Sequence, residues 1–354
     1  MTTSTTDTSA GAPRNIVSAV RRRRRRLLIG IVVAVLALVV AVVLSLMLGA
    51  RYIEPSAVLH ALLHYDRRDD DSLVVVDSRL PRTLLGLLAG LALGLAGTVM
   101  QGLSRNPLAD PGILGVNFGA SLAVVVAISF FGITSLTGYL WFAFAGAALA
   151  SVVVYLVASR GREGATPVKL ALAGAAVSAA LGSLITAVLL TSQVSLDALR
   201  FWQVGSLAGR GFDIVAQVLP TIVVGTVLAL ALGRVLNGLA LGDDVARGLG
   251  QRVGLSRLFS ALAIVLLCGS ATAAVGPIAF VGLVVPHAAR WVVGGDYRWI
   301  LAFSAVLAPT LLLVCDVIGR VVASPGELQV GIVTAVVGAP VFIALVRRRK
   351  LVTL

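Results

Sequence analysis

The sequence predicts an all-α, polytopic membrane protein with about ten transmembrane helices. The chain has 354 residues, of which 58% are hydrophobic, and its mean hydropathy is +1.00. Apolar segments of about 18 residues or more recur along it, which is the length that a helix needs to cross a bilayer. The segments are continuously apolar, whereas transmembrane β-strands would be short and alternate in polarity.

Ten apolar segments are expected to span the membrane. They are 27–48, 84–100, 113–131, 140–158, 168–190, 214–236, 258–275, a short segment ending near Val293, 299–318 and 330–346. The first is too long for a cleaved signal peptide, whose apolar part has about 7–15 residues. A twin-arginine export signal also begins with paired arginines, but the spans that follow favour an anchor.

The distribution of arginine predicts the topology. Six arginines precede the first span, and Arg347, Arg348, Arg349 and Lys350 follow the last. Cations collect on cytoplasmic segments, so both termini are expected inside, as an even number of spans requires. Residues 1–26 are expected to form a disordered basic tail and residues 27–350 a single transmembrane domain.

The segment Asn237–Arg257, here called the polar segment, is the longest polar stretch in the second half of the chain. It is longer than a simple turn between spans requires and has room for one or two short helices outside the bilayer. Gly248 and Gly250 would allow the backbone to change direction. By charge alone it could be an ordinary solvated loop with cytoplasmic arginines, or it could be a docking surface for a soluble protein that drives the membrane part.

Composition excludes several functions. The net charge of +13 would suggest nucleic acid in a soluble protein, but in this chain it is explained by cytoplasmic arginines, so no nucleic-acid partner is expected. Neither of the two lysines follows a glycine, so there is no phosphate loop, and nucleotide energy would have to come from another chain. The two cysteines lie inside apolar segments, and the three histidines are scattered. His60 and His64 could share a helix face, but no metal or cofactor site is expected.

Arg79 and Arg82 lie at the outer end of the second span, against the usual charge bias. They could reach toward lipid headgroups, or they could bind carboxylates of an acidic partner. Asp316 and Arg320 are four residues apart and are expected to pair on one helix face. The outer loop 191–212 carries Asp197, Arg200, Trp202 and Arg210, to which no function is assigned.

Several motifs, in this order and spacing, give the chain a resemblance to the permease subunits of bacterial ABC importers for iron–siderophore complexes, haem and cobalamin. They are Arg79-Leu80-Pro81-Arg82, Met100-Gln101-Gly102, the stretch from Asn106 to Gly115, Leu241-Gly242-Asp243-Asp244 with Ala246 and Leu249-Gly250, the stretch from Gly276 to Leu283 with Pro286-His287, and Gly331 with the stretch from Gly338 to Phe342. The match covers Leu27 to Leu351.

The resemblance implies the type II ABC importer permease fold. It also implies a partner permease subunit, identical or paralogous, two ATPase subunits and an extracytoplasmic substrate-binding protein. The ATPase would dock on the polar segment, at Leu241, Gly242, Asp243, Asp244, Ala246, Arg247, Leu249, Gly250, Arg252 and Arg257. Acidic residues of the binding protein would meet Arg79, Arg82 and Arg320. The chain itself would catalyse no reaction, and its cargo would be a ferric siderophore, haem or cobalamin.

The main alternative is an ion-coupled secondary transporter. Such proteins keep ionisable residues at mid-membrane for coupling, and the interiors of the expected spans have very few. An intramembrane enzyme would need a cluster of His, Asp, Glu or Ser within the spans, and none is apparent. The sequence therefore predicts a multi-pass permease subunit of the bacterial cell membrane, which would transport its cargo by alternating access.

Overall fold

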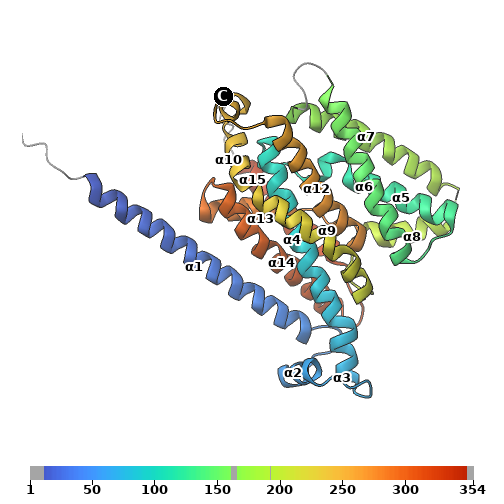
Figure 1. The fold of residues 1–354 in the computed structure, drawn as a ribbon. Coiled ribbons are helices and arrows are strands. Elements are labelled where there is room, and N and C mark those ends of the chain that lie inside the picture. Colours follow the sequence, from blue (N-terminus) through green and yellow to red (C-terminus); the bar gives the residue numbers. More distant parts are fainter. Residues whose placement is uncertain (1–11, 161–165, 192, 349–354) are drawn as a thin grey trace, which may run out of the picture.

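The computed structural model describes residues 12–160, 166–191 and 193–348, and within these ranges the chain is helical with no β-strand. Ten of the described helices form the transmembrane body, and Figure 1 shows their arrangement. They are α1 (Ala12–Met47), α4 (Leu80–Ser104), α5 (Val116–Phe131), α6 (Leu136–Ser159), α7 (Pro167–Leu189), α9 (Phe212–Ala231), α12 (Val253–Val275), α13 (Val281–Val293), α14 (Tyr297–Val322) and α15 (Val330–Arg348). Seven of them are long and apolar enough to cross a bilayer, and α5, α13 and α15 are shorter apolar helices. The all-α prediction with about ten spans is confirmed.

Short helices occupy the two ends of the body. At one end lie α2 (Pro55–Leu63), α3 (Asp70–Ser72) and the π-helical turn η1 (Leu73–Arg79), and at the other lie α10 (Gly233–Ala240) and α11 (Asp243–Gly248). The remaining elements are the 3₁₀ turn η2 (Pro111–Leu114) and α8 (Gln193–Gln203). Figure 1 places the end of α15 beside α10 and places α2 and α3 at the opposite end.

Helix α4 is the axis around which the body is packed. Within its span, 78% of the most apolar window is buried, compared with 17% for α1 and for α7. Glycines make this close packing possible: a Cβ on Gly97 would lie 2.0 Å from the Gly282 carbonyl oxygen, and one on Gly90 would lie 2.5 Å from Pro309 Cα. Helices in lipid are not driven together by the hydrophobic effect, so van der Waals packing stabilises their association, and close backbone contacts of this kind increase it.

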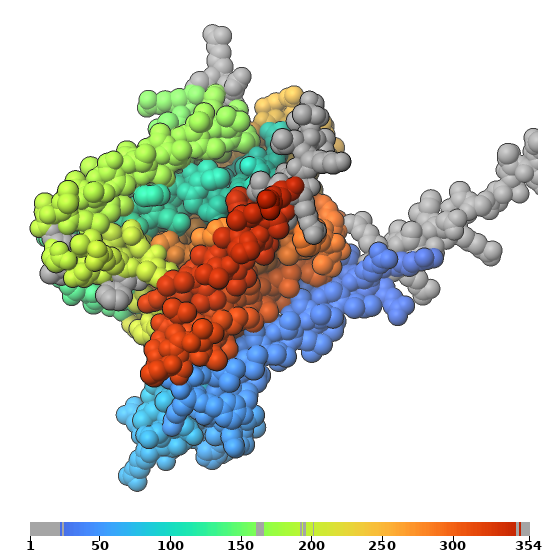
Figure 2. Space-filling view, turned by 180° about the vertical axis from the view of Figure 1, so that it is seen from behind, coloured from blue at the N-terminus to red at the C-terminus, as the bar shows by residue number. Residues whose placement is uncertain are grey.

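The outer helices have large apolar surfaces. Figure 2 shows α15 in red on the outside of the body, with orange segments beside it and α1 in darker blue running toward the right. Helix α1 exposes Val32, Leu36, Val39, Val40 and Val43. A surface of this kind requires a hydrocarbon solvent, so the helical body is membrane-embedded.

The chain leaves the helical conformation between α12 and α13. Gly276 has φ of 79° and lies against the Trp202 carbonyl oxygen, where a Cβ would be 2.1 Å away. Phe280 also has a positive φ, of 69°, and directly precedes α13. Gly282 and Pro286, in contrast, lie inside α13, which accommodates them without a break.

Three local predictions differ from the structure. Helix α1 begins at Ala12, so residues 12–26 continue the first span as helix where a disordered tail was expected; residues 1–11 lie outside the described residues. The second span begins earlier than expected, because η1 and α3 extend it back to Asp70. The loop 191–212 contains the helix α8, whose polar and apolar residues alternate with helical spacing.

Candidate docking sites at the two ends of the body

The polar segment forms a helical hairpin at one end of the body. Helix α10 ends at Ala240, and Gly242, with φ of 105°, turns the chain into α11. A second turn follows at Gly250, with φ of 81°, before α12 begins at Val253. The prediction of short helices linked by flexible glycines is therefore confirmed at Gly250, whereas Gly248 completes α11 in ordinary helical geometry.

Asp243 attaches this hairpin to the body. Its carboxylate accepts a hydrogen bond from Arg257 Nη2 on α12 at 2.6 Å and another from Arg105 Nη2, after the end of α4, at 2.7 Å. The Arg257 side chain is only 8% exposed. A hydrogen-bonded ion pair this well buried loses much stability if one partner is removed. Asp243 thus connects α11 to two transmembrane helices.

A second attachment joins α10 to the start of α14. Asn237 donates from Nδ2 to Asp296 Oδ1 and accepts from the Tyr297 backbone N–H, both at 2.8 Å. Hydrogen bonds from Arg298 and Asn237 hold the pKa of Asp296 below its usual range, so this carboxylate is ionised at neutral pH. The hairpin is therefore held rigidly against α4, α12 and α14.

The residues predicted for ATPase docking separate into two groups. Ala246, Asp243 and Arg257 face the body and hold the hairpin in place. The others are solvent-facing or turn residues: Leu241, Gly242, Asp244, Arg247, Leu249, Gly250 and Arg252. Arg247 and Asp244 pair on the surface at 2.7 Å.

The solvent-facing side of the hairpin carries an apolar row that the sequence analysis missed in part. Leu241, Val245 and Leu249 are 64%, 48% and 65% exposed and are spaced four residues apart along the chain. Val245 was not among the predicted residues, although its position four residues before the predicted Leu249, at helical spacing, is the signal that could have identified it. Arg105 was also missed, because a single arginine in a loop carries no indication of its partner.

At the opposite end, Arg79, Arg82 and Arg320 form what we call the arginine cluster, and they are 5%, 9% and 2% exposed. Arg82 binds Asp316 through Nε and Nη2, the latter at 2.8 Å, and Glu327 through Nη1 at 2.8 Å. Arg320 also pairs with Asp316, at 3.1 Å, which is the i,i+4 pair expected from the sequence. Arg79 and Arg82 were expected to reach lipid headgroups or the carboxylates of an acidic partner, and in the structure both are buried with partners inside the chain.

Arg79 and Arg320 hold the last turn of α1. Arg79 donates to the carbonyl oxygens of Leu46, Met47 and Arg51, and Arg320 donates to those of Ser45 and Leu48. The final carbonyls of a helix have no partner within the helix and carry its negative dipole end, so buried cations are favourable there. These buried arginines therefore join the end of α1 to η1 and α14.

The comparisons with known proteins decide the family. Residues 37–348 match the FecCD transport family. The chain belongs to this family. It is 51% identical over 314 residues to the ferric enterobactin transport system permease protein FepD of Escherichia coli (strain K12), covering 89% of this chain and 93% of that one. It is 41% identical over 307 residues to the iron(3+)-hydroxamate import system permease protein FhuB of Bacillus subtilis (strain 168), covering 87% and 80%.

A solved structure with a similar fold shows the architecture of this FecCD-family permease. A metal-chelate type ABC transporter in an inward-facing conformation superimposes with a TM-score of 0.79 at 28% identity, covering 91% of this chain and 100% of that chain. The predicted type II ABC importer permease fold is therefore confirmed. Membership of the family also agrees with a subunit that carries no catalytic centre of its own.

Proposed function

We propose that this permease is one subunit of an ATP-driven importer that carries a ferric siderophore across the bacterial cell membrane. Its partners would be a second permease subunit, identical or paralogous, two ATPase subunits and an extracytoplasmic binding protein. The names of FepD and FhuB support iron chelates as the cargo class. Haem and cobalamin remain the other cargoes that the family resemblance allows.

The observation that carries this proposal is the rigid hairpin of the polar segment with its exposed apolar row. Leu241, Val245 and Leu249 present three large aliphatic side chains to solvent at a point fixed to α4 and α12 through Asp243. Exposed aliphatic groups on a firmly anchored projection suit a protein partner that must transmit force. Movement of that partner on ATP binding would be passed to the transmembrane helices, which would rock between outward-facing and inward-facing states.

Charge supports the orientation of the body. The start of α1, which contains the arginine run, and the end of α15 lie at the same end of the body as α10 (Figure 1). By the bias of cations toward cytoplasmic segments, that end would be inside and both termini cytoplasmic. An ATPase in the cytoplasm could then reach the hairpin.

The outer end would receive the binding protein. Arg82 is the member of the arginine cluster whose partners include a partly exposed carboxylate, that of Glu327, which is 36% exposed. An acidic side chain of the binding protein could replace Glu327 there at little cost, because exposed ion pairs contribute only about 0–1 kcal/mol. Arg79 and Arg320 would contribute by holding α1 in position rather than by touching the partner.

Co-purification tests the docking of the ATPase. The double variant L241E/L249E changes two exposed side chains, so the permease should insert normally but should bind its ATPase at least tenfold more weakly. The variant L219E/L230E makes the same change on exposed leucines of α9 and tests membrane insertion instead. ATPase recovery equal to wild type from L241E/L249E would refute the proposed docking surface.

A further inference from the structure

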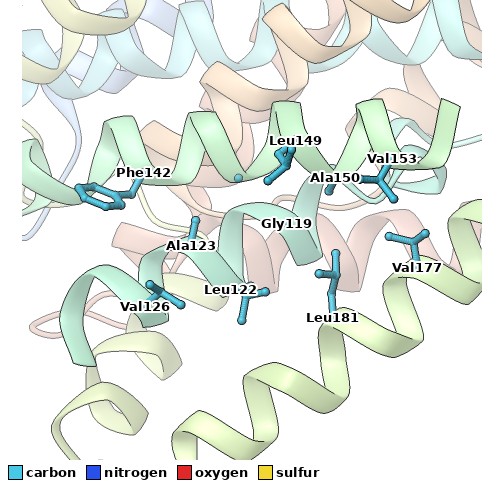
Figure 3. A pocket seen from close by; sticks show the side chains of 11 residues that line it. Gly119, Leu122, Ala123, Val126, Phe142, Leu149, Ala150, Val153, Val177 and Leu181 are labelled. Atoms are coloured by element: carbon cyan, nitrogen blue, oxygen red, sulfur yellow. The ribbon is translucent and has the colours of Figure 1, made fainter. Parts of the chain in front are cut away.

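A small polar pocket lies where α6, α8, the segment 204–211 and the start of α15 meet, and none of its lining residues belongs to the two docking sites described above. Its volume is about 220 Å³. The polar side chains that line it are Tyr139, Trp202, Ser206, Arg210 and Gln329. A larger cavity of about 310 Å³ lies between α5, α6 and α7. Among the described residues it is lined by hydrocarbon side chains and glycine, as Figure 3 shows, and these cannot recognise a polar ligand.

The wall of the polar pocket is fixed by the backbone. The Ser206 N–H donates to the Val275 carbonyl at 2.8 Å, and the Gly331 N–H donates to the Gly205 carbonyl at 3.1 Å. The Ser206 hydroxyl also accepts from the Ala208 N–H at 3.1 Å. Segment 204–208 is therefore held between the end of α12 and the start of α15, so the pocket does not need to be ordered when a ligand binds.

Two buried donors in this pocket have no acceptor among the described residues. Trp202 is only 2% exposed, and its indole N–H has no hydrogen-bond partner in the part of the chain that the structure describes. Within the same described part, the buried Nε–H of Arg210 is unpartnered as well. An unsatisfied buried donor destabilises the folded state, and native proteins rarely leave one without a reason. Two such donors on side chains that line one pocket indicate an acceptor that arrives with a ligand.

The charge of Arg210 is also uncompensated. Arg82, Arg257 and Arg320 each have a carboxylate partner, and Arg79 has three carbonyl oxygens. For Arg210, the partner found in the described part of the chain is the neutral Tyr139 hydroxyl. Burial lowers the pKa of this guanidinium, which means that its charged form is held at a cost that a bound anion would offset.

We propose that this pocket binds one anionic, oxygen-rich group of the iron chelate as it enters the transport path. The inference rests on the proposed function. The volume is below the range of about 300–1,000 Å³ that holds whole small molecules, so one arm of a larger chelate fits and the rest lies outside. The guanidinium and the indole N–H are donors, and a catecholate or carboxylate oxygen is the acceptor that they require.

Equilibrium binding of ferric enterobactin to the full-length chain tests this assignment. The chain is placed in nanodiscs made only of zwitterionic phosphatidylcholine. R210Q should raise the Kd at least tenfold, and W202F, which removes the indole N–H, should raise it about threefold. R210K, which keeps the charge but loses the planar donor pair, should lie between wild type and R210Q.

R200Q is the matched control, because Arg200 lies on neighbouring α8 with a side chain 69% exposed and should leave the Kd unchanged. A neutral ferric trihydroxamate should lose much less affinity in R210Q than anionic ferric enterobactin does. Thermal unfolding midpoints equal to wild type establish that the variants are folded. Equal Kd values for ferric enterobactin in wild type, R210Q and R200Q would overturn the assignment.

Two further readouts separate the possible failures. If the pocket holds a lipid phosphate, R210Q will change the amount of anionic lipid that co-purifies from cells and leave the Kd for the chelate unaltered, which also overturns the assignment. Uptake into vesicles containing the ATPase and binding protein tests the proposed function by itself. ATP-dependent uptake that is equal in wild type and R210Q would remove the pocket's role and leave the proposed function intact.

Discussion

Replacing Asp243 with Asn should loosen the hairpin while the transmembrane body stays folded. The change removes the charge that Arg257 and Arg105 share, at 2.6 and 2.7 Å, and keeps the size of the side chain. Arg257 is left as a buried cation. Removing the partner of a buried charge costs about 3–5 kcal/mol, but Asn retains a carbonyl acceptor and Asp243 is 22% exposed, so about 2–3 kcal/mol is expected.

This energy sets the size of the measurable effect. Each 1.4 kcal/mol is tenfold in an equilibrium constant, so local opening of the hairpin should become about 30- to 140-fold more frequent. Hydrogen–deuterium exchange of amides in residues 241–257 reports this opening directly. The same variant should bind the ATPase more weakly, because the apolar row is no longer held in place.

Two variants control for this reasoning. R105Q removes the ion pair whose arginine is 35% exposed, which should cost less than about 1 kcal/mol. The double variant D243N/R257M removes the unpaired cation and should recover part of the lost protection. Exchange in D243N that matches wild type, or that matches R105Q, would refute the argument that Asp243 anchors the hairpin.

Two other substitutions test the packing of the body. D316N leaves Arg82 and Arg320 without their shared buried carboxylate and should lower the free energy of unfolding by about 3–5 kcal/mol. E327Q changes a side chain that is 36% exposed and should lower it by less than about 1 kcal/mol. Thermal unfolding in detergent compares the two variants, and similar midpoints would contradict a structural role for the arginine cluster. G97V would place a Cβ only 2.0 Å from the Gly282 carbonyl oxygen, which is far too close. The variant should therefore weaken the contact between α4 and α13 by about 1–3 kcal/mol or more. G254A has open space and should be neutral within about 1 kcal/mol, so equal stability of G97V and G254A would show that α4 and α13 separate freely.

Hydropathy was sufficient to predict the helical body. The ten expected segments correspond to ten helices, because lipid requires each crossing segment to satisfy its own backbone hydrogen bonds. The i,i+4 spacing also predicted the Asp316–Arg320 pair. Both signals are local in sequence, so they can be recognised before any tertiary contact is known.

Long-range pairing was not predictable from the sequence. Arg82 is 234 residues from Asp316, and Arg105 is 138 residues from Asp243. Nothing local distinguishes Arg79, which caps the end of α1, from an arginine that faces a partner. The pocket around Trp202 and Arg210 is formed by four elements that are separate in the sequence. Patterns within one sequence do not show which separate elements pack together.

Uptake into vesicles tests the central claim most directly. Wild-type permease, reconstituted with its ATPase and binding protein, should accumulate ferric enterobactin only when ATP is supplied, and an uncoupler should have no effect. The L241E/L249E variant should abolish this accumulation while inserting normally. Accumulation by the permease without any ATPase, driven by an ion gradient and abolished by the uncoupler, would contradict the claim and would favour an ion-coupled secondary transporter.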